Sequence, residues 1–366
     1  MCLEVVDITP ISIAVTSGSG SSADALALDR SLLNQLEQWG FLYVTSSDLQ
    51  RGAAADTLAA AEAAGKQFFC QPLAVKMQAL SKDRARRGYS PAMSENFYSL
   101  LLTSESTDIS SNSGSNNNNT RSNDDVEKLR FGPLSAAATS PDDDYYTSKE
   151  GRVHFFANPF DAVTSALPYF REATEECYLL LERLSLLLLV AVERSLGLAA
   201  GHFVDCMERH TSILTYNYYG SSSSALQPNT PSSYGDGDDG KVYRIAEHTD
   251  VSMITLVYQS HLPPDQGGLE VLSSEGIWTL VPHIPGALVV NVGDCLQEWT
   301  GGRLRSTRHR VRTSGVGERL SIAFFVSPNY RAMVQVGGAA CSYSAWRQGR
   351  VKRAVAKQQK KKKDTT

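Results

Sequence analysis

The fold is decided by three short runs: Glu-His-Thr-Asp at residues 247–250, Thr-Arg-His-Arg-Val at 307–311 and Arg-Leu-Ser at 319–321. Alternate side chains of an extended strand point to the same face, so His248 and Asp250 can converge on one point. His309 lies far downstream, beyond several strand-like segments. The sequence therefore predicts a sheet that folds back on itself and brings these three side chains together.

The predicted cluster has the ligand types of a metal site. Two imidazoles and one carboxylate can cover one face of a metal ion and leave the other coordination positions open, which is typical of non-haem iron(II) oxygenases. A zinc hydrolase fits less well, because no glutamate accompanies the histidines in a His-Glu-x-x-His pattern. The joint order of the three runs, more than the His-x-Asp pair alone, favours the iron interpretation.

Arg319 and Ser321 alternate in an apolar strand pattern and are predicted to share one face. A guanidinium and a hydroxyl on one face suit a carboxylate ligand. The charges of Fe(II), one aspartate, a 2-oxo dicarboxylate and Arg319 add to about zero, which a buried site tolerates far better than an isolated charge. The pair therefore predicts an anion-binding part of the same site.

These motifs resemble, in order, those of the iron(II)/2-oxoglutarate-dependent dioxygenases of the isopenicillin N synthase-like superfamily. The segments that carry the resemblance are 216–219, 248–250, 267–271, 276–278, 285–294, 309–311 and 319–321. The resemblance implies an α+β, mainly β fold, a double-stranded β-helix or jelly-roll barrel flanked by helices. It also implies an enzyme that hydroxylates or desaturates a small organic substrate with O2 and releases succinate and CO2.

The resemblance also assigns cofactors and residue roles. Fe(II) would be the metal, 2-oxoglutarate the cosubstrate and O2 the oxidant, with ascorbate as a further candidate. The catalytic iron ligands would be His248, Asp250 and His309, the residues for the distal carboxylate of 2-oxoglutarate Arg319 and Ser321, and the other cosubstrate-pocket residues Asn217 and Tyr219.

Two other activities remain open at the level of the sequence. A 2-oxoglutarate-independent Fe(II) oxidase, similar to isopenicillin N synthase or aminocyclopropanecarboxylate oxidase, would carry the same Arg-x-Ser pair. A non-catalytic jelly-roll binding protein could keep the fold without the chemistry, although all three ligand residues argue against it. Nothing selects among flavonoid-like, hormone-like, amino-acid-derived or other small substrates, and the oligomeric state is equally open.

The predicted organisation has five segments. They are an N-terminal region of strand and helices (1–103), a disordered low-complexity insertion (104–126), a linking segment with a long support helix (127–204), the catalytic jelly-roll core (205–330, with a flexible insertion at 221–240) and a C-terminal segment with a basic tail (331–366). The acidic residues at 235–240 lack the closing glutamate of an EF-hand, so we expect no calcium loop there.

The composition predicts a globular protein of the cytoplasm. The chain has 366 residues, 42% of them hydrophobic, and a formal net charge of −4, which favours no polyanionic partner such as nucleic acid. The first residues lack the pattern of a secretory signal, and no apolar run is long enough to cross a membrane. The six cysteines form no C-x-x-C pair and are expected to be reduced thiols.

Helical spacing of apolar residues predicts helices at 31–39, 53–69, 168–196 and 343–359, with Gly40 ending the first. In the third, the predicted core positions are Leu179, Leu180, Leu184, Leu187, Leu188 and Val192. Residues 41–44 are predicted to form a strand.

Some residues near these motifs are given structural or pocket roles. The loop around Tyr89 and residues 97–98 are candidates for the substrate pocket. Asp294 follows a glycine and is interpreted as capping its own backbone. The histidines outside the predicted metal site are expected to be structural: His154, His202, His210, His261 and His283.

Overall fold

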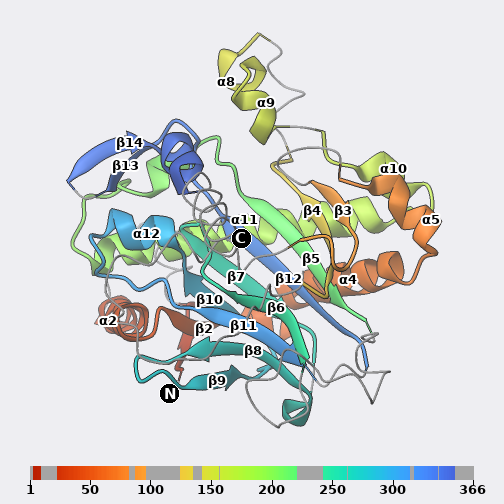
Figure 1. The fold of residues 1–366 in the computed structure, drawn as a ribbon. Coiled ribbons are helices and arrows are strands. Elements are labelled where there is room, and N and C mark those ends of the chain that lie inside the picture. Colours follow the sequence, from red (N-terminus) through yellow and green to blue (C-terminus); the bar gives the residue numbers. More distant parts are fainter. Residues whose placement is uncertain are drawn as a thin grey trace, which may run out of the picture.

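Two β-sheets form the centre of the computed structural model, which describes residues 3–9, 23–81, 87–95, 124–134, 142–155, 157–220, 242–261, 263–313, 317–336 and 338–350 (Figure 1). The eight-stranded sheet has the order β1 (Val5–Asp7), β2 (Phe41–Thr45), β10 (Ala287–Val292), β7 (Ile254–Gln259), β12 (Arg319–Val326), β5 (Ile213–Tyr219), β4 (Glu127–Phe131), β3 (Gly88–Ser90). The four-stranded sheet has the order β6 (Val242–His248), β11 (His309–Thr313), β8 (Gly267–Leu272), β9 (Trp278–Val281). From β5 to β12 the chain passes repeatedly between the two sheets.

Strand β12 shows how one sequence serves both faces of the large sheet. Leu320, Ile322 and Phe324 are completely buried in the main hydrophobic core, whereas the alternate residues Arg319 and Ser321 line a cavity between the sheets. This follows from the alternation of side chains in an extended strand. The register places Arg319 opposite Tyr219 and Ser321 opposite Asn217 on β5. Two neighbouring strands thus direct polar side chains to the same interior space.

Three long helices cover the outer face of the large sheet (Figure 1). They are α2 (Ala23–Gln38), α4 (Ala53–Phe69) and α11 (Phe170–Ser195). The prediction of residues 53–69 is confirmed in full, and Gly40 ends the first helical segment with a left-handed φ of 67°. The core positions of α11 are wrong at one residue, since Leu179 is 52% exposed while Leu181 is completely buried. The buried stripe of the helix passes beside Leu179 and not through it.

Shorter elements connect these layers. They are α3 (Ser47–Arg51), α5 (Leu73–Lys76), α8 (Asp144–Thr147), α9 (Gly151–His154), α10 (Phe160–Thr164), α12 (Asp294–Trp299), the 3-10 turns η1 (Met77–Ala79), η2 (Val204–Met207) and η3 (Pro264–Gln266), and a hairpin of β13 (Met333–Val336) and β14 (Ala339–Ser342). A helical segment follows the hairpin at residues 343–350, and the rest of the helix predicted to reach 359 lies outside the described residues.

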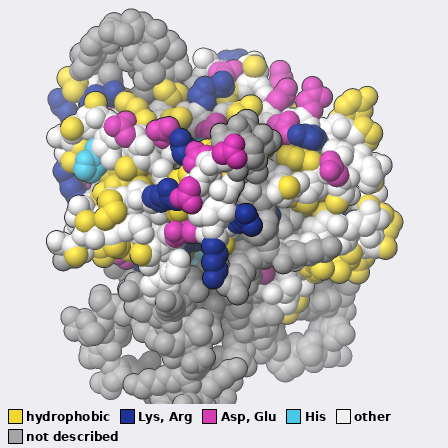
Figure 2. All heavy atoms as spheres, turned by 90° about the horizontal axis from the view of Figure 1, so that it is seen from above, with side chains coloured by type: hydrophobic (Ala, Val, Ile, Leu, Met, Phe, Trp, Pro, Cys, Tyr) yellow, Lys and Arg dark blue, Asp and Glu magenta, His cyan; other side chains and the backbone are white. Residues whose placement is uncertain are grey.

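The two predicted insertions lie almost entirely outside the described residues, as do residues 97–98 and the basic tail. The last residues of the first insertion, 124–126, are described, and Asp124 and Val126 are buried there. In the described part of the chain, no helix combines the length and the apolar character needed to cross a membrane. Figure 2 shows basic and acidic side chains interspersed on the face seen from above.

Candidate active site

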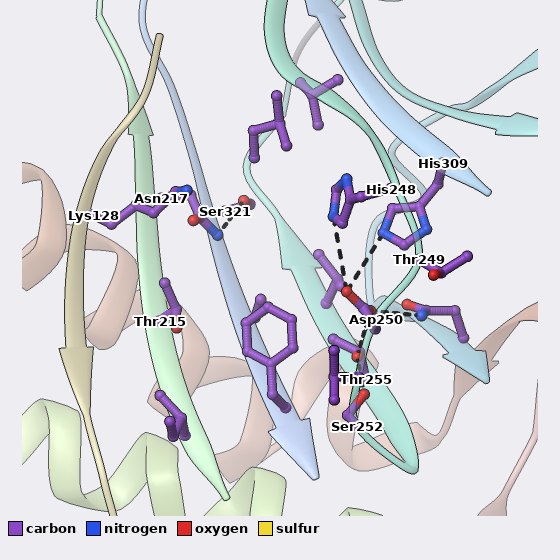
Figure 3. A pocket seen from close by; sticks show the side chains of 18 of the residues that line it. Lys128, Thr215, Asn217, His248, Thr249, Asp250, Ser252, Thr255, His309 and Ser321 are labelled. Carbon is purple, nitrogen blue, oxygen red and sulfur yellow. Dashed lines mark hydrogen bonds and ion pairs between the residues drawn. The ribbon is translucent and has the colours of Figure 1, made fainter. Parts of the chain in front are cut away.

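The three predicted metal ligands lie together at one end of the small sheet (Figure 3). His248 ends β6 and His309 begins β11, and the two are direct partners in the antiparallel ladder. Asp250 follows β6 and turns back toward both imidazoles. Its Oδ1 lies 3.8 Å from Nε2 of His248 and 3.7 Å from Nε2 of His309. All three residues are buried, and one ligand atom from each lies within 4.8 Å of the others.

Backbone carbonyls fix the orientation of both imidazoles. Nδ1 of His248 donates to the carbonyl of Ala246 at 2.7 Å, and Nδ1 of His309 donates to the carbonyl of Thr307 at 3.1 Å. A carbonyl oxygen only accepts, so each Nδ1 carries the proton and each Nε2 presents a lone pair to the common point. This is the tautomer that a metal requires. Burial, with a smaller effect of the neighbouring His309, also lowers the pKa of His248 to about 3.

The two carboxylate oxygens of Asp250 have different neighbours. Oδ2 accepts from Oγ1 of Thr255 at 2.6 Å and from Nδ2 of Asn291 at 2.8 Å, while Oδ1 faces the imidazoles. Burial raises the pKa of Asp250, but the two histidines and these two donors outweigh it, so the pKa is lowered. The carboxylate is therefore ionised at neutral pH. Sequence reasoning missed both donors, because neither Thr255 nor Asn291 belongs to the ligand motifs.

The four predicted cosubstrate residues line a cavity of about 460 Å³. The side chains of His248, Asp250 and His309, together called the metal cluster here, line the same cavity. The Arg319 guanidinium lies 4.9 Å from the ring centre of Tyr219, and its Nη2 donates to Oε1 of Gln259 at 2.9 Å. Nδ2 of Asn217 donates to Oγ of Ser321 at 3.4 Å. Nη1 of Arg319 is buried and has no hydrogen-bond partner among the described residues. A buried guanidinium nitrogen without an acceptor is costly, so this position fits an incoming carboxylate.

A second wall of the cavity was not predicted. It is formed by Glu95, Lys128, Arg130 and Arg347, together called the basic wall here. The signal that could have found it is the alternation of Lys128 and Arg130 in a short strand, which places both on one face. Tyr89, in contrast, does not line the cavity. It packs in the main hydrophobic core, and its hydroxyl donates to Glu127. Glu95, in the segment that follows Tyr89, does line the cavity, so the loop reaches the cavity through Glu95 and not through Tyr89.

The sequence suggested that the Asp294 side chain caps its own backbone. The side chain instead supports residues 248–250, called the ligand loop here. Asp294 begins α12, and its Oδ2 accepts from Oγ1 of Thr249 at 3.0 Å and from the Arg350 guanidinium. Its amide donates to the carbonyl of Asp250 at 2.7 Å. The interpretation failed because the partners come from distant segments. Both contacts restrain the backbone between His248 and Asp250.

Two family models match long segments of the chain. One, described as the 2OG-Fe(II) oxygenase superfamily, matches residues 210–328, which include every predicted site residue. The other, described as the N-terminal part of the non-haem dioxygenase in morphine synthesis, matches residues 3–128. The chain belongs to the 2OG-Fe(II) oxygenase superfamily. The isopenicillin N synthase-like relationship inferred from the motifs is thereby confirmed.

Curated relatives of this oxygenase-family chain come from different organisms. A probable iron/ascorbate oxidoreductase from Dictyostelium discoideum is 37% identical over 151 residues, 40% of this chain and 40% of that protein. Gibberellin 20 oxidase 2 from Oryza sativa is 29% identical over 296 residues, 81% of this chain and 61% of that protein. The matched part is less than two thirds of each relative's length. These matches therefore support the family and leave the substrate open.

Solved structures confirm the jelly-roll fold of this family member. The crystal structure of the dioxygenase for auxin oxidation in rice is similar over 96% of this chain and 95% of that one, with a TM-score of 0.63 and 21% identity. At this identity the likeness shows the fold alone. Members of the superfamily are oxidoreductases that use Fe(II), 2-oxoglutarate and O2. The buried donor set of two imidazoles and a carboxylate fits the metal, and Nη1 of Arg319 fits the cosubstrate.

Proposed function

We propose that this protein is an Fe(II)- and 2-oxoglutarate-dependent dioxygenase that hydroxylates or desaturates a small organic substrate. The observation that carries the proposal is that three potential ligand atoms converge on one point. His248 Nε2, Asp250 Oδ1 and His309 Nε2 face one buried point, while the other polar atom of each side chain is occupied by a hydrogen bond. Such prior orientation of ligands raises metal affinity, and the other coordination positions stay open.

The roles of these side chains follow from their protonation states. Two neutral imidazoles and one carboxylate would hold Fe(II) with a net charge of about +1, and an anionic cosubstrate would balance it. Bound there with 2-oxoglutarate, Fe(II) would supply O2 activation and the oxidation of a substrate C–H bond, with release of succinate and CO2. None of the three ligand residues needs to transfer a proton. Their task is to hold the metal at a fixed place in the cavity.

The cosubstrate residues would orient 2-oxoglutarate from the opposite side of the cavity. Arg319 Nη1 is the donor that lacks an acceptor, and the Ser321 hydroxyl lies on the same strand face. Gln259 holds the other Arg319 nitrogen, and the Tyr219 ring supports the guanidinium plane. A fixed fork of this kind binds a carboxylate through two parallel hydrogen bonds.

We also infer a cytoplasmic location. The five described cysteines are all free, in line with a reducing compartment. Fluorescence microscopy of the tagged full-length chain tests this inference, and accumulation of the protein in an organelle or at the cell surface would contradict it.

The decisive experiment is an anaerobic titration of the purified protein with Fe(II) and then 2-oxoglutarate, followed by visible absorption. A metal-to-ligand charge-transfer band that appears only after both additions reports chelated cosubstrate. We expect the band in the wild type and its loss in His309→Ala. His261→Ala is the matched control, because His261 is exposed and lies outside the site.

Each other outcome has a clear meaning. Bound iron without a band, together with O2 consumption but no succinate, would favour a 2-oxoglutarate-independent oxidase. A protein that binds no iron under these conditions would favour a non-catalytic binding role and would overturn the proposal.

A further inference from the structure

Lys128 and Arg130 of the basic wall lie on β4, next to the strand that carries Asn217 and Tyr219 and two strands away from Arg319 and Ser321. In the large sheet Lys128 on β4 is the direct partner of Asn217 on β5, and Asn217 is the partner of Ser321 on β12. Adjacent strands lie about 4.8 Å apart, so the backbone of Lys128 is about 10 Å from that of Ser321. Figure 3 shows Lys128 on the far side of the cavity from His248 and His309. The wall therefore lies beside Asn217, farther from the predicted metal ligands than Ser321 is.

Four buried charges in and behind this wall compensate one another. Glu95 binds Arg130 through two hydrogen bonds of 2.7 and 2.6 Å and binds Nζ of Lys128 at 3.1 Å. Oδ2 of Asp124 lies 4.0 Å from the same ammonium. All four residues are at most 7% exposed. Two acids and two bases give this group a net charge of zero, as a buried cluster requires.

Arg347 adds a positive charge that the described chain does not compensate. It extends from the helical segment at 343–350 and lines the cavity in a half-buried position. No carboxylate of the described residues forms an ion pair with it. Tyr343, one turn earlier, also lines the cavity, and its hydroxyl donates to Oγ of Ser327 at 3.0 Å, which fixes this side of the segment. Together with Asp124 behind it, the wall thus carries one excess positive charge.

Apolar side chains line part of the cavity, beside the polar Thr215, Asn217 and Ser321. Ile213, Val257, Ala323 and Phe325 line this part of the cavity. An apolar stretch with one cationic end suits a molecule with a carbon body and one anionic end. The cavity of about 460 Å³ must also hold 2-oxoglutarate, so that molecule is small.

We propose that the primary substrate is a small monocarboxylic acid with an apolar body, whose carboxylate binds Arg347 in the cavity. The inference rests on the proposed function and names the substrate class for the same site. Glu95, Lys128 and Arg130 hold the wall in place, and Arg347 provides the free guanidinium. The apolar body then extends from Arg347 toward the metal cluster, which brings a carbon atom near the open coordination positions.

The electrostatics of Lys128 agree with an anion at this wall. Burial and, to a smaller extent, the nearby Arg130 lower its pKa to about 8, while Glu95 and Asp124 oppose the shift. A buried ammonium that is difficult to keep charged is stabilised by one more negative charge in the cavity. A neutral ligand would lack this effect.

The test compares acids with their neutral analogues. The probes are phenylacetate, cinnamate, hexanoate and decanoate, each paired with its primary amide, and binding is measured by ligand-observed NMR. The protein is the full chain, both metal-free and loaded anaerobically with Fe(II) and 2-oxoglutarate. We expect at least one acid to bind at least tenfold more tightly than its amide. If no pair shows an acid preference, the inference is overturned.

Variants of Arg347 decide whether it is the residue that recognises the carboxylate. Arg347→Gln is expected to raise the dissociation constant of the preferred acid at least tenfold and to leave the Fe(II)–2-oxoglutarate charge-transfer band unchanged. Arg347→Lys should recover part of the affinity, and the exposed Arg152→Gln is the control. Unchanged acid affinity in Arg347→Gln would contradict the inference. Absence of the band in the wild type would contradict the proposed function instead. The two failures can be told apart, because acid binding is also measured on the metal-free protein.

Discussion

The Asp250 carboxylate shows how much of a metal site lies outside its ligands. Its Oδ2 is held by Thr255 and Asn291, which leaves Oδ1 for the proposed metal. We predict that Thr255→Val lowers Fe(II) affinity about tenfold or more, because partners of a ligating carboxylate orient it. Equilibrium dialysis with Fe(II) under anaerobic conditions measures the effect.

Thr215→Val is the matched control for this prediction. Thr215 is also buried and lines the same cavity, but its Oγ1 has no hydrogen-bond partner. The same loss of a hydroxyl is therefore expected to leave metal affinity within about twofold. Equal effects of the two variants would show that the Thr255 hydroxyl has no specific role.

Arg319 gives a second prediction at this scale. Arg319→Lys is expected to raise the dissociation constant of 2-oxoglutarate about tenfold while iron binding is retained, because an ammonium cannot form the paired hydrogen bonds of a guanidinium. The titration of the charge-transfer band measures it. Arg331→Lys, an exposed arginine, controls for the substitution itself. Unchanged cosubstrate affinity would rule out the assigned role of Arg319.

Residues of the site differ in how well the sequence predicts them. His248, Asp250 and His309 stand in short motifs, and the structure brings them together. Lys128 and Arg347 stand in no motif, and their place depends on how strand β4 pairs with β5 and how a C-terminal helical segment docks on the sheets. Such docking is a long-range property that local patterns do not encode.

Elements were predictable where their local pattern matches their packing. Helix α4 was predicted with correct bounds, because its alanine-rich sequence favours helix and its apolar residues keep one phase. Helix α2 starts well before the predicted residue 31. Leu26 is exposed and Leu28 is buried, so the residues before 31 show too little apolar spacing to predict this start. In α11 the leucines surround much of the helix, so periodicity alone could not decide that Leu179 faces solvent.

The close approach of α4 to the sheet gives a prediction at the element scale. A Cβ atom at Gly65 would lie 2.7 Å from the Tyr216 ring and 3.0 Å from Leu320. We expect Gly65→Ala to lower the free energy of unfolding by about 1–3 kcal/mol through overpacking, although alanine is the better helix former. Urea unfolding followed by circular dichroism measures it.

The control lies in the same helix. Ala60 is exposed, so Ala60→Gly changes helix propensity without changing packing and should cost about 1 kcal/mol. If Gly65→Ala were stabilising, the contact between α4 and the sheet would be looser than the structure indicates.

At the scale of the whole molecule, the C-terminal segment holds distant parts together. Arg350 pairs with Asp294 and with Glu298 of α12, at 3.0 Å for the second pair, and Asp294 in turn holds Thr249 beside the metal cluster. Tyr330, immediately before this segment, stacks on His154 of α9 with ring centres 5.2 Å apart, and Arg331 pairs with Asp144 at 2.6 Å. The same segment therefore supports the ligand loop, carries Arg347 and contacts the linking region.

The His154 contact makes global stability depend on pH. Burial among Tyr330 and Phe155, with smaller effects of the charges of Arg347 and Arg87, lowers the pKa of His154 from its ordinary value of 6.5 to about 3. The unfolded chain therefore binds a proton at this histidine between about pH 6.5 and 3, while the folded chain does not. Stability from this group is complete above pH 6.5 and decreases as the pH falls, by up to about 1.4 kcal/mol per pH unit.

We predict that this dependence is reduced in His154→Gln. Between pH 7.5 and 5 the free energy of unfolding of the wild type should fall by about 2 kcal/mol more than that of the variant. Urea unfolding at a series of pH values measures both slopes, and comparing slopes removes any constant cost of the substitution. The exposed His202→Gln is the control and should follow the wild type. Parallel pH profiles for His154→Gln and the wild type would mean that His154 accepts its proton in the folded protein, and the contact between α9 and the C-terminal segment would then have to open to admit the charge.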